Sequence, residues 1–121
     1  DHQPHEPDAK LDPFPQTEPG ISALETLLPL TLQLVRDGVL DLPAALGCLT
    51  CHPADILNRP CGRLAVGADA DITVFDPDAR WVPSADTLIS RGLNSPFIGT
   101  RVQGRARYTF LGGRTVLRRE D

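Results

Sequence analysis

The first twenty residues limit the possible folds of this chain more than any other stretch. Five prolines punctuate them: Pro4, Pro7, Pro13, Pro15 and Pro19. Proline fixes one backbone torsion and removes an amide donor, so a helix or a central strand cannot run through this stretch. An irregular loop of this length is costly to order unless it packs against something. We therefore expect this loop to lie against a larger body of protein.

A helix is predicted directly after this loop. Ser22 and Glu25 have the spacing of a capping box, and apolar residues follow at helical intervals. The helix is expected to run to about Asp37, where Gly38 can end it. Two shorter helices should follow, one from about Asp41 over residues 44–49 and one from Pro53 to about Asn58.

The sequence period changes to that of strands after the helices. Predicted strands lie at 62–66, 71–75, 106–111 and 114–117, with 80–82 as a candidate fifth. Asp76-Pro77 is expected to end the second of them. Gly112 and Gly113 can supply the positive φ angles of a type I′ hairpin turn.

The composition argues against two classes of partner. The formal net charge is −4, whereas a general nucleic-acid binder needs surplus Lys and Arg to neutralise phosphates. Six arginines in 101–119 form a basic end, which we interpret as the solvated faces of strands, with a partner surface as the alternative. No apolar run is long enough to span a membrane. We expect neither a nucleic-acid nor a membrane partner.

A short cysteine motif at residues 48–52 reads Cys-Leu-Thr-Cys-His, which matches a haem-attachment pattern. The motif lies in an apolar stretch, and the chain has no methionine as a second axial ligand. A closed zinc site needs four ligands, and only Cys61 is nearby. Buried thiols without a ligand are therefore the interpretation that we favour.

Several motifs together resemble the dihydroorotases of the amidohydrolase superfamily. The N-terminal ones are Asp1-His2-Gln3-Pro4-His5, Pro13-Phe14 and Gly20–Thr26, and the later ones are His52-Pro53-Ala54, Gly62–Asp71 and Asn94–Gly99. The resemblance implies an α/β fold: the C-terminal end of a (β/α)₈ TIM barrel plus part of a small β-sandwich subdomain. Residues 1–58 would be the last barrel loop and C-terminal barrel helices, and residues 59–121 the β-rich composite subdomain. The chain would thus be a C-terminal fragment that begins at the D-H-x-P-H motif, with the N-terminal remainder as its partner.

The resemblance also implies an activity, the reversible cyclisation of N-carbamoyl-L-aspartate to dihydroorotate in de novo pyrimidine biosynthesis. A metal-activated hydroxide, on one or two zinc ions, would attack the cyclic amide. Asp1 would be the general acid/base and would touch the metal, whose other ligands would lie in the N-terminal part. His5 would bind the substrate carboxylate, and the backbone at Pro19 and Gly20 would contact the ring. His2 would be structural, bonding within the loop.

Two departures from the family pattern concern substrate specificity. Pro19 stands where the family usually has Phe, and Gln3 where it usually has Ala. These changes affect fine specificity and leave the proton chemistry in place. A separate alternative within the superfamily is an allantoinase or dihydropyrimidinase, although these relatives generally lack the Pro4-His5 pair. Another is a catalytically inactive dihydroorotase homologue that serves as a structural partner of aspartate transcarbamoylase. A cytoplasmic homodimer is the expected form of the whole protein.

Overall fold

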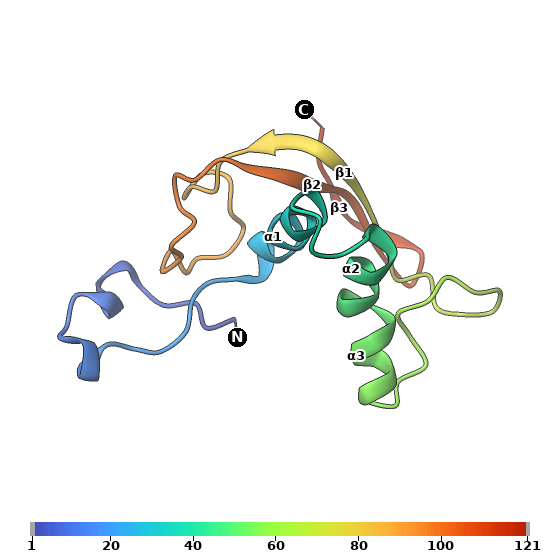
Figure 1. Ribbon diagram of the computed structural model, residues 1–121, viewed down its shortest axis with the longest axis horizontal. Coiled ribbons are helices and arrows are strands. Elements are labelled where there is room, and N and C mark those ends of the chain that lie inside the picture. Colours follow the sequence, from blue (N-terminus) through green and yellow to red (C-terminus); the bar gives the residue numbers. More distant parts are fainter. Residues whose placement is uncertain (1, 121) are drawn as a thin grey trace.

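A three-stranded antiparallel sheet is the largest element of the computed structural model, which describes residues 2–120. The strands are β1 (Ile72–Trp81), β2 (Val102–Leu111) and β3 (Arg114–Arg118), in the order β1-β2-β3. The sheet arches over the helices in Figure 1, with α1 (Leu24–Arg36) directly beneath it. The observed architecture confirms the α/β class.

The core lies where α1 crosses β2. Leu32 is buried in this contact, and a Cβ added at Gly104 on β2 would come within 2.4 Å of its side chain. Gly104 also has a φ of +106°, a conformation that favours glycine. On the same strand pair, Trp81 Nε1 donates a hydrogen bond to the Gly104 carbonyl at 3.0 Å. The absence of a side chain at residue 104 therefore lets helix and sheet approach closely.

Two further helices lead away from the sheet: α2 (Leu42–Leu49) and α3 (Cys51–Ile56). The Asp41 carboxylate accepts a hydrogen bond from the Ala44 N–H at 2.7 Å and so caps α2, as its position at the predicted start suggests. The third helix begins two residues before the predicted Pro53. No helix within residues 2–120 has the length and apolarity that a membrane crossing requires.

The predicted end of a strand at Asp76-Pro77 is wrong, because β1 continues through it to Trp81. The register with β2 is irregular between Asp76 and Arg80. The Asp76 carboxylate accepts hydrogen bonds from the N–H groups of Asp78 and Ala79 within this irregular stretch, and Arg107 donates to it from β2 at 3.0 Å. Hydrogen bonds from Asp78 N–H and Arg107 hold the pKa of Asp76 below its usual range. These bonds stabilise the irregular stretch, so β1 continues past Pro77.

The predicted strand at 62–66 is also wrong. These residues form an exposed, irregular segment, and Leu64 and Val66 are almost fully exposed. A strand needs a neighbouring strand to satisfy its backbone, and the described residues offer none here. The C-terminal hairpin, in contrast, is confirmed. Gly112 and Gly113 have φ angles of +54° and +76°, as a type I′ turn requires.

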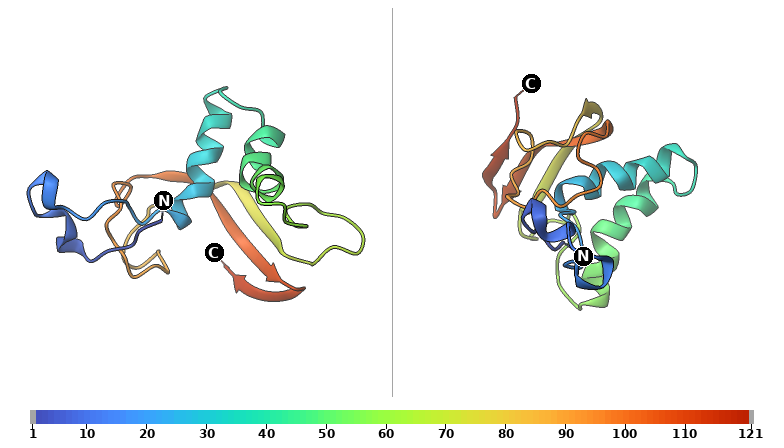
Figure 2. Two further views of the ribbon diagram at one scale, coloured as in Figure 1. Left: turned by 90° about the horizontal axis from the view of Figure 1, so that it is seen from below. Right: turned by 90° about the vertical axis from the view of Figure 1, so that its left-hand side faces the viewer.

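Residues 2–20 form two short 3₁₀ turns, η1 (Pro7–Lys10) and η2 (Phe14–Gln16), within an otherwise irregular loop. In Figures 1 and 2 this loop lies on the same side of α1 as the irregular segment 84–100, on the opposite side from α2 and α3. The two segments are far apart in sequence, and their contact forms the site described next.

Candidate functional site

The two ends of the N-terminal loop run side by side. His2 and Ile21 form a parallel β-bridge, and the Gln3 N–H donates to the Ile21 carbonyl at 2.8 Å. This pairing closes the loop at its base. The predicted substrate-binding residues His5 and Gly20 therefore lie close to this pairing, on the two sides of the loop base.

His2 orients the start of α1. Its Nδ1 accepts hydrogen bonds from the backbone N–H groups of Ala23 and Leu24, at 3.1 and 3.3 Å. In a neutral ring this leaves the proton on Nε2. His2 is thus structural, as predicted, although its partners lie at the start of the helix and not within the loop.

The predicted capping box at Ser22 and Glu25 is wrong. The N-cap residue of α1 is Ala23, whose side chain cannot cap the helix. Ser22 Oγ instead bonds Ser90 Oγ at 3.2 Å, and the Glu25 carboxylate accepts from the N–H groups of Ile89 and Ser90. The His2 imidazole takes the local role, so both side chains are free to hold a distant segment.

Asn94 connects that distant segment to the loop base. Its Oδ1 accepts from the His5 N–H at 2.7 Å, and its Nδ2 donates to the carbonyls of Gln3 and Gly20, at 2.8 and 3.5 Å. The side chain is buried, and the Asn94 carbonyl accepts from the Ser22 N–H at 3.3 Å. The side-chain amide of Asn94 therefore bonds the backbone on both sides of the loop base, and we call these three hydrogen bonds the clamp.

Two glycines lie at close backbone contacts where a larger residue would not fit. A Cβ added at Gly92 would lie 2.3 Å from Pro4 Cβ, and one added at Gly20 would lie within the side chain of Gln3. Gly20 also has a φ of +81°. Glycine at residue 20 was expected for close approach of a ligand. In this structure the atoms that approach it belong to Gln3.

The structure places the predicted site residues as follows. The His5 backbone is fixed by Asn94, while its half-buried imidazole makes no hydrogen bond with any of residues 2–120. Gly20 lies on the same clamp, and its neighbour Pro19 is exposed. Asp1, the predicted acid/base and metal ligand, lies outside the described residues. The arrangement can present the His5 side chain to a bound molecule.

The sequence prediction missed the role of Asn94. The residue begins the motif Asn94–Gly99, which the sequence analysis used only as part of the resemblance to a family. The hydrogen-bond partners of its side chain are 74 to 91 residues away, and no local sequence pattern indicates such contacts.

Metal ligands do not gather within the part of the chain that the structure describes. No group of three or more His, Cys, Asp or Glu side chains within residues 2–120 is placed to hold an ion. The expected burial of the cysteines is wrong for two of them, since Cys48 and Cys61 are exposed and Cys51 is half-buried. All three thiols are free. The described residues alone therefore do not form a zinc site.

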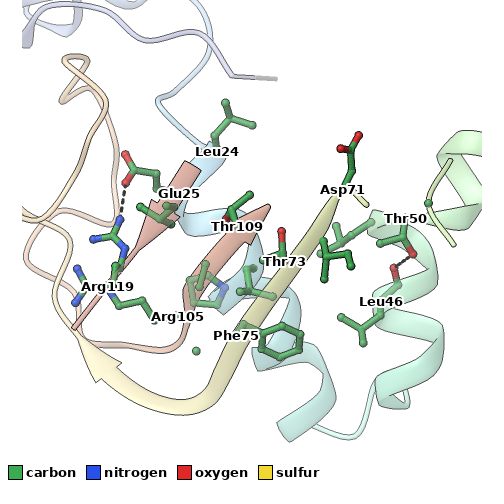
Figure 3. Close-up of a pocket in the computed structure, with 18 of the residues that line it drawn as sticks. Leu24, Glu25, Leu46, Thr50, Asp71, Thr73, Phe75, Arg105, Thr109 and Arg119 are labelled. Atoms are coloured by element: carbon green, nitrogen blue, oxygen red, sulfur yellow. Dashed lines mark hydrogen bonds and ion pairs between the residues drawn. The ribbon is translucent and has the colours of Figure 1, made fainter. Parts of the chain in front are cut away.

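A groove of about 600 Å³ lies between α1, α2 and the sheet, separate from the loop base. Figure 3 shows Phe75, Leu46 and Leu24 around it, with the Glu25–Arg119 ion pair at 3.6 Å at one end. Its walls are largely apolar. Because β1 is also an edge strand of the described sheet, this side of the chain has an apolar face and a strand edge that residues 2–120 do not cover.

Residues 17–116 match the amidohydrolase family, and the chain therefore belongs to it. Among relatives, it is 53% identical over 112 residues to a "Dihydroorotase-like protein" of Pseudomonas aeruginosa, covering 93% of this chain and 26% of that protein. It is 47% identical to a "Dihydroorotase" of Geobacter metallireducens, covering 98% of this chain and 28% of the relative. The chain thus spans about a quarter of the length of these relatives.

Solved structures of hydantoinases resemble this fold. A D-hydantoinase superimposes with a TM-score of 0.81 at 26% identity, covering 92% of this chain and 25% of that chain. An L-hydantoinase (dihydropyrimidinase) from Arthrobacter aurescens gives 0.78 at 31% identity, covering 88% and 24%. The chain is therefore similar in sequence to dihydroorotases and similar in structure to hydantoinases.

Proposed function

We propose that the protein containing this chain is a dihydroorotase, which interconverts N-carbamoyl-L-aspartate and dihydroorotate in de novo pyrimidine biosynthesis. The observation that carries the proposal is the placement of His5. Its backbone is held by a buried amide, whereas its imidazole makes no bond to residues 2–120. A histidine presented in this way can donate a charge-assisted hydrogen bond to a carboxylate. Dihydroorotate has a carboxylate, and the simple cyclic amide dihydrouracil has none.

The remaining roles rest on the resemblance to dihydroorotases. The backbone at Pro19 and Gly20 would contact the pyrimidine ring, and Asp1 would take and return the proton as general acid/base. Zinc would supply the activated water when bound. Its ligands other than Asp1 would come from the N-terminal remainder of the same protein, since residues 2–120 do not form a metal site.

The whole protein would be a cytoplasmic homodimer. Residues 1–58 would complete a (β/α)₈ barrel, and residues 59–121 would belong to a small β-sandwich subdomain. The uncovered groove and the edge of β1 support this arrangement, because both need a covering partner. The relatives are about four times as long as this chain, so the covering partner would be the remainder of the same polypeptide.

Two specific observations favour other functions. The hydantoinase structures fit an allantoinase- or dihydropyrimidinase-type enzyme. The name "Dihydroorotase-like protein" of relatives at 53 and 54% identity fits a catalytically inactive homologue that is a structural partner of aspartate transcarbamoylase.

A substrate comparison with the full-length, zinc-loaded protein separates these functions. We expect hydrolysis of dihydroorotate and cyclisation of N-carbamoyl-L-aspartate, with slower or absent hydrolysis of dihydrouracil, hydantoin and allantoin. Preference for one of the last three would assign the hydantoinase-type alternative. No turnover of any of them, together with co-purification of aspartate transcarbamoylase, would assign the inactive homologue.

His5→Ala should mainly weaken substrate binding in the full-length protein. A hydrogen bond to a charged group contributes about 1.5–3 kcal/mol, so KM for dihydroorotate should rise roughly tenfold to a hundredfold with a smaller change in kcat. Steady-state kinetics measure both constants. His52→Ala is the matched control, because His52 is exposed on α3, far from the loop base. An unchanged KM in His5→Ala would show that another residue binds the carboxylate.

A further inference from the structure

We propose that Asn94 is a positioning residue, which holds the backbone of the two substrate-binding segments in register through its side-chain amide. The proposal rests on the proposed function, because that function assigns substrate contacts to His5 and Gly20. Asn94 bonds the backbone of both residues and of Gln3 as well, at 2.7, 3.5 and 2.8 Å. Asn94 thus bonds the two segments that would bind substrate, and the proposed function assigns it no contact with substrate.

The chemistry of these bonds requires an amide. One partner is an N–H donor and two are carbonyl acceptors, so the side chain must accept at one atom and donate at the other. Of the side chains of this length, only asparagine does both through two different atoms. A carboxylate would face the carbonyls of Gln3 and Gly20 without a proton to donate, and the buried site would make that mismatch costly.

Further hydrogen bonds from the start of α1 hold the segment that carries Asn94. The Glu25 carboxylate accepts from the N–H groups of Ile89 and Ser90, and Ser22 Oγ bonds Ser90 Oγ. Gly92 then lets the chain pass directly against Pro4, where a Cβ would clash at 2.3 Å. The segment 89–94 is therefore fixed to the start of α1 at one end and to the loop base at the other. Loss of the Asn94 amide would remove its bonds to His5, Gln3 and Gly20, while this support and the Gln3–Ile21 bond remained.

The test is Asn94→Ala in the full-length protein, with Asn94→Asp as a second variant that keeps the size and removes the donor. Asn58→Gly is the matched control, because Asn58 is the other asparagine of the chain, is exposed, and has a φ of +50° that glycine adopts freely. Two measurements are made: steady-state kinetics with dihydroorotate, and amide hydrogen exchange of the peptides that cover residues 2–5 and 20–24.

Positioning predicts that both Asn94 variants raise KM by about tenfold or more, lower kcat by a smaller factor, and speed amide exchange in both segments. Asn58→Gly should change none of these. A purely structural role would reduce the amount of active protein, which lowers apparent kcat and leaves KM unchanged. That result, or unchanged exchange in the two segments, would overturn the proposal. If the wild-type protein does not hydrolyse dihydroorotate, the proposed function fails, and the exchange measurement still decides whether Asn94 holds the loop base.

Discussion

Replacing Asp1 with asparagine in the full-length protein should lower turnover in both directions by about a hundredfold to ten-thousandfold, the usual contribution of a general acid/base. An amide has nearly the same size as a carboxylate, but it cannot accept a proton from water and deliver it to the leaving nitrogen. Asp1 lies outside the described residues, so its role rests on the resemblance of the D-H-x-P-H motif. The next two residues of the motif, His2 and Gln3, are both bonded to the segment 21–24.

Steady-state rates of dihydroorotate hydrolysis and carbamoyl-aspartate cyclisation measure this effect. Asp12→Asn is the matched control, because Asp12 is an exposed carboxylate of the same loop with no hydrogen bond to the rest of residues 2–120. An unchanged melting temperature in Asp1→Asn shows that folding is intact. If the Asp1 variant kept more than about a tenth of the wild-type rate, the general acid/base assignment would be wrong.

Elements with strictly local causes could be predicted from the sequence. Asp41 caps α2 through a bond to an N–H three residues away, and Gly112-Gly113 form the hairpin turn through their own torsion angles. Predictions were wrong where a side chain bonds a distant partner. Glu25 has the spacing of a capping residue but bonds Ile89 and Ser90 instead, 64 and 65 residues away. The same local pattern therefore has two uses, and only tertiary structure chooses between them.

The candidate site shows the same division. Resemblance to a family identified His5 and Gly20, and the structure brings their backbones onto one clamp. The clamp itself could not be predicted, because Asn94 is a buried polar residue in a segment without helical or strand period. Its importance becomes visible only when its three backbone partners are known.

Residues 1–121 purified without the remainder of the protein should have no dihydroorotase activity and should bind zinc poorly. The described part of the chain holds no group of three metal-ligating side chains, and Asp1 adds at most one ligand. We also expect residues 1–121 to associate with the proposed N-terminal remainder. Burial of apolar surface contributes about 25 cal/mol per Å², and the groove, Leu64 and Val66 all offer such surface.

Size-exclusion chromatography of separately produced N-terminal and C-terminal parts tests the association, and an activity assay of the mixture tests whether the site assembles. We expect the two parts to co-elute and the mixture to turn over substrate, whereas each part alone does not. The groove gives a specific variant: Leu46→Asp places a charge in its apolar wall, where a covering partner could not solvate it, and should weaken co-elution. Asp1→Asn should leave co-elution unchanged, because the proposed acid/base acts on substrate and not on assembly. A well-folded, monodisperse monomer of residues 1–121 would contradict the argument, because it would show that the uncovered groove and the edge of β1 need no partner.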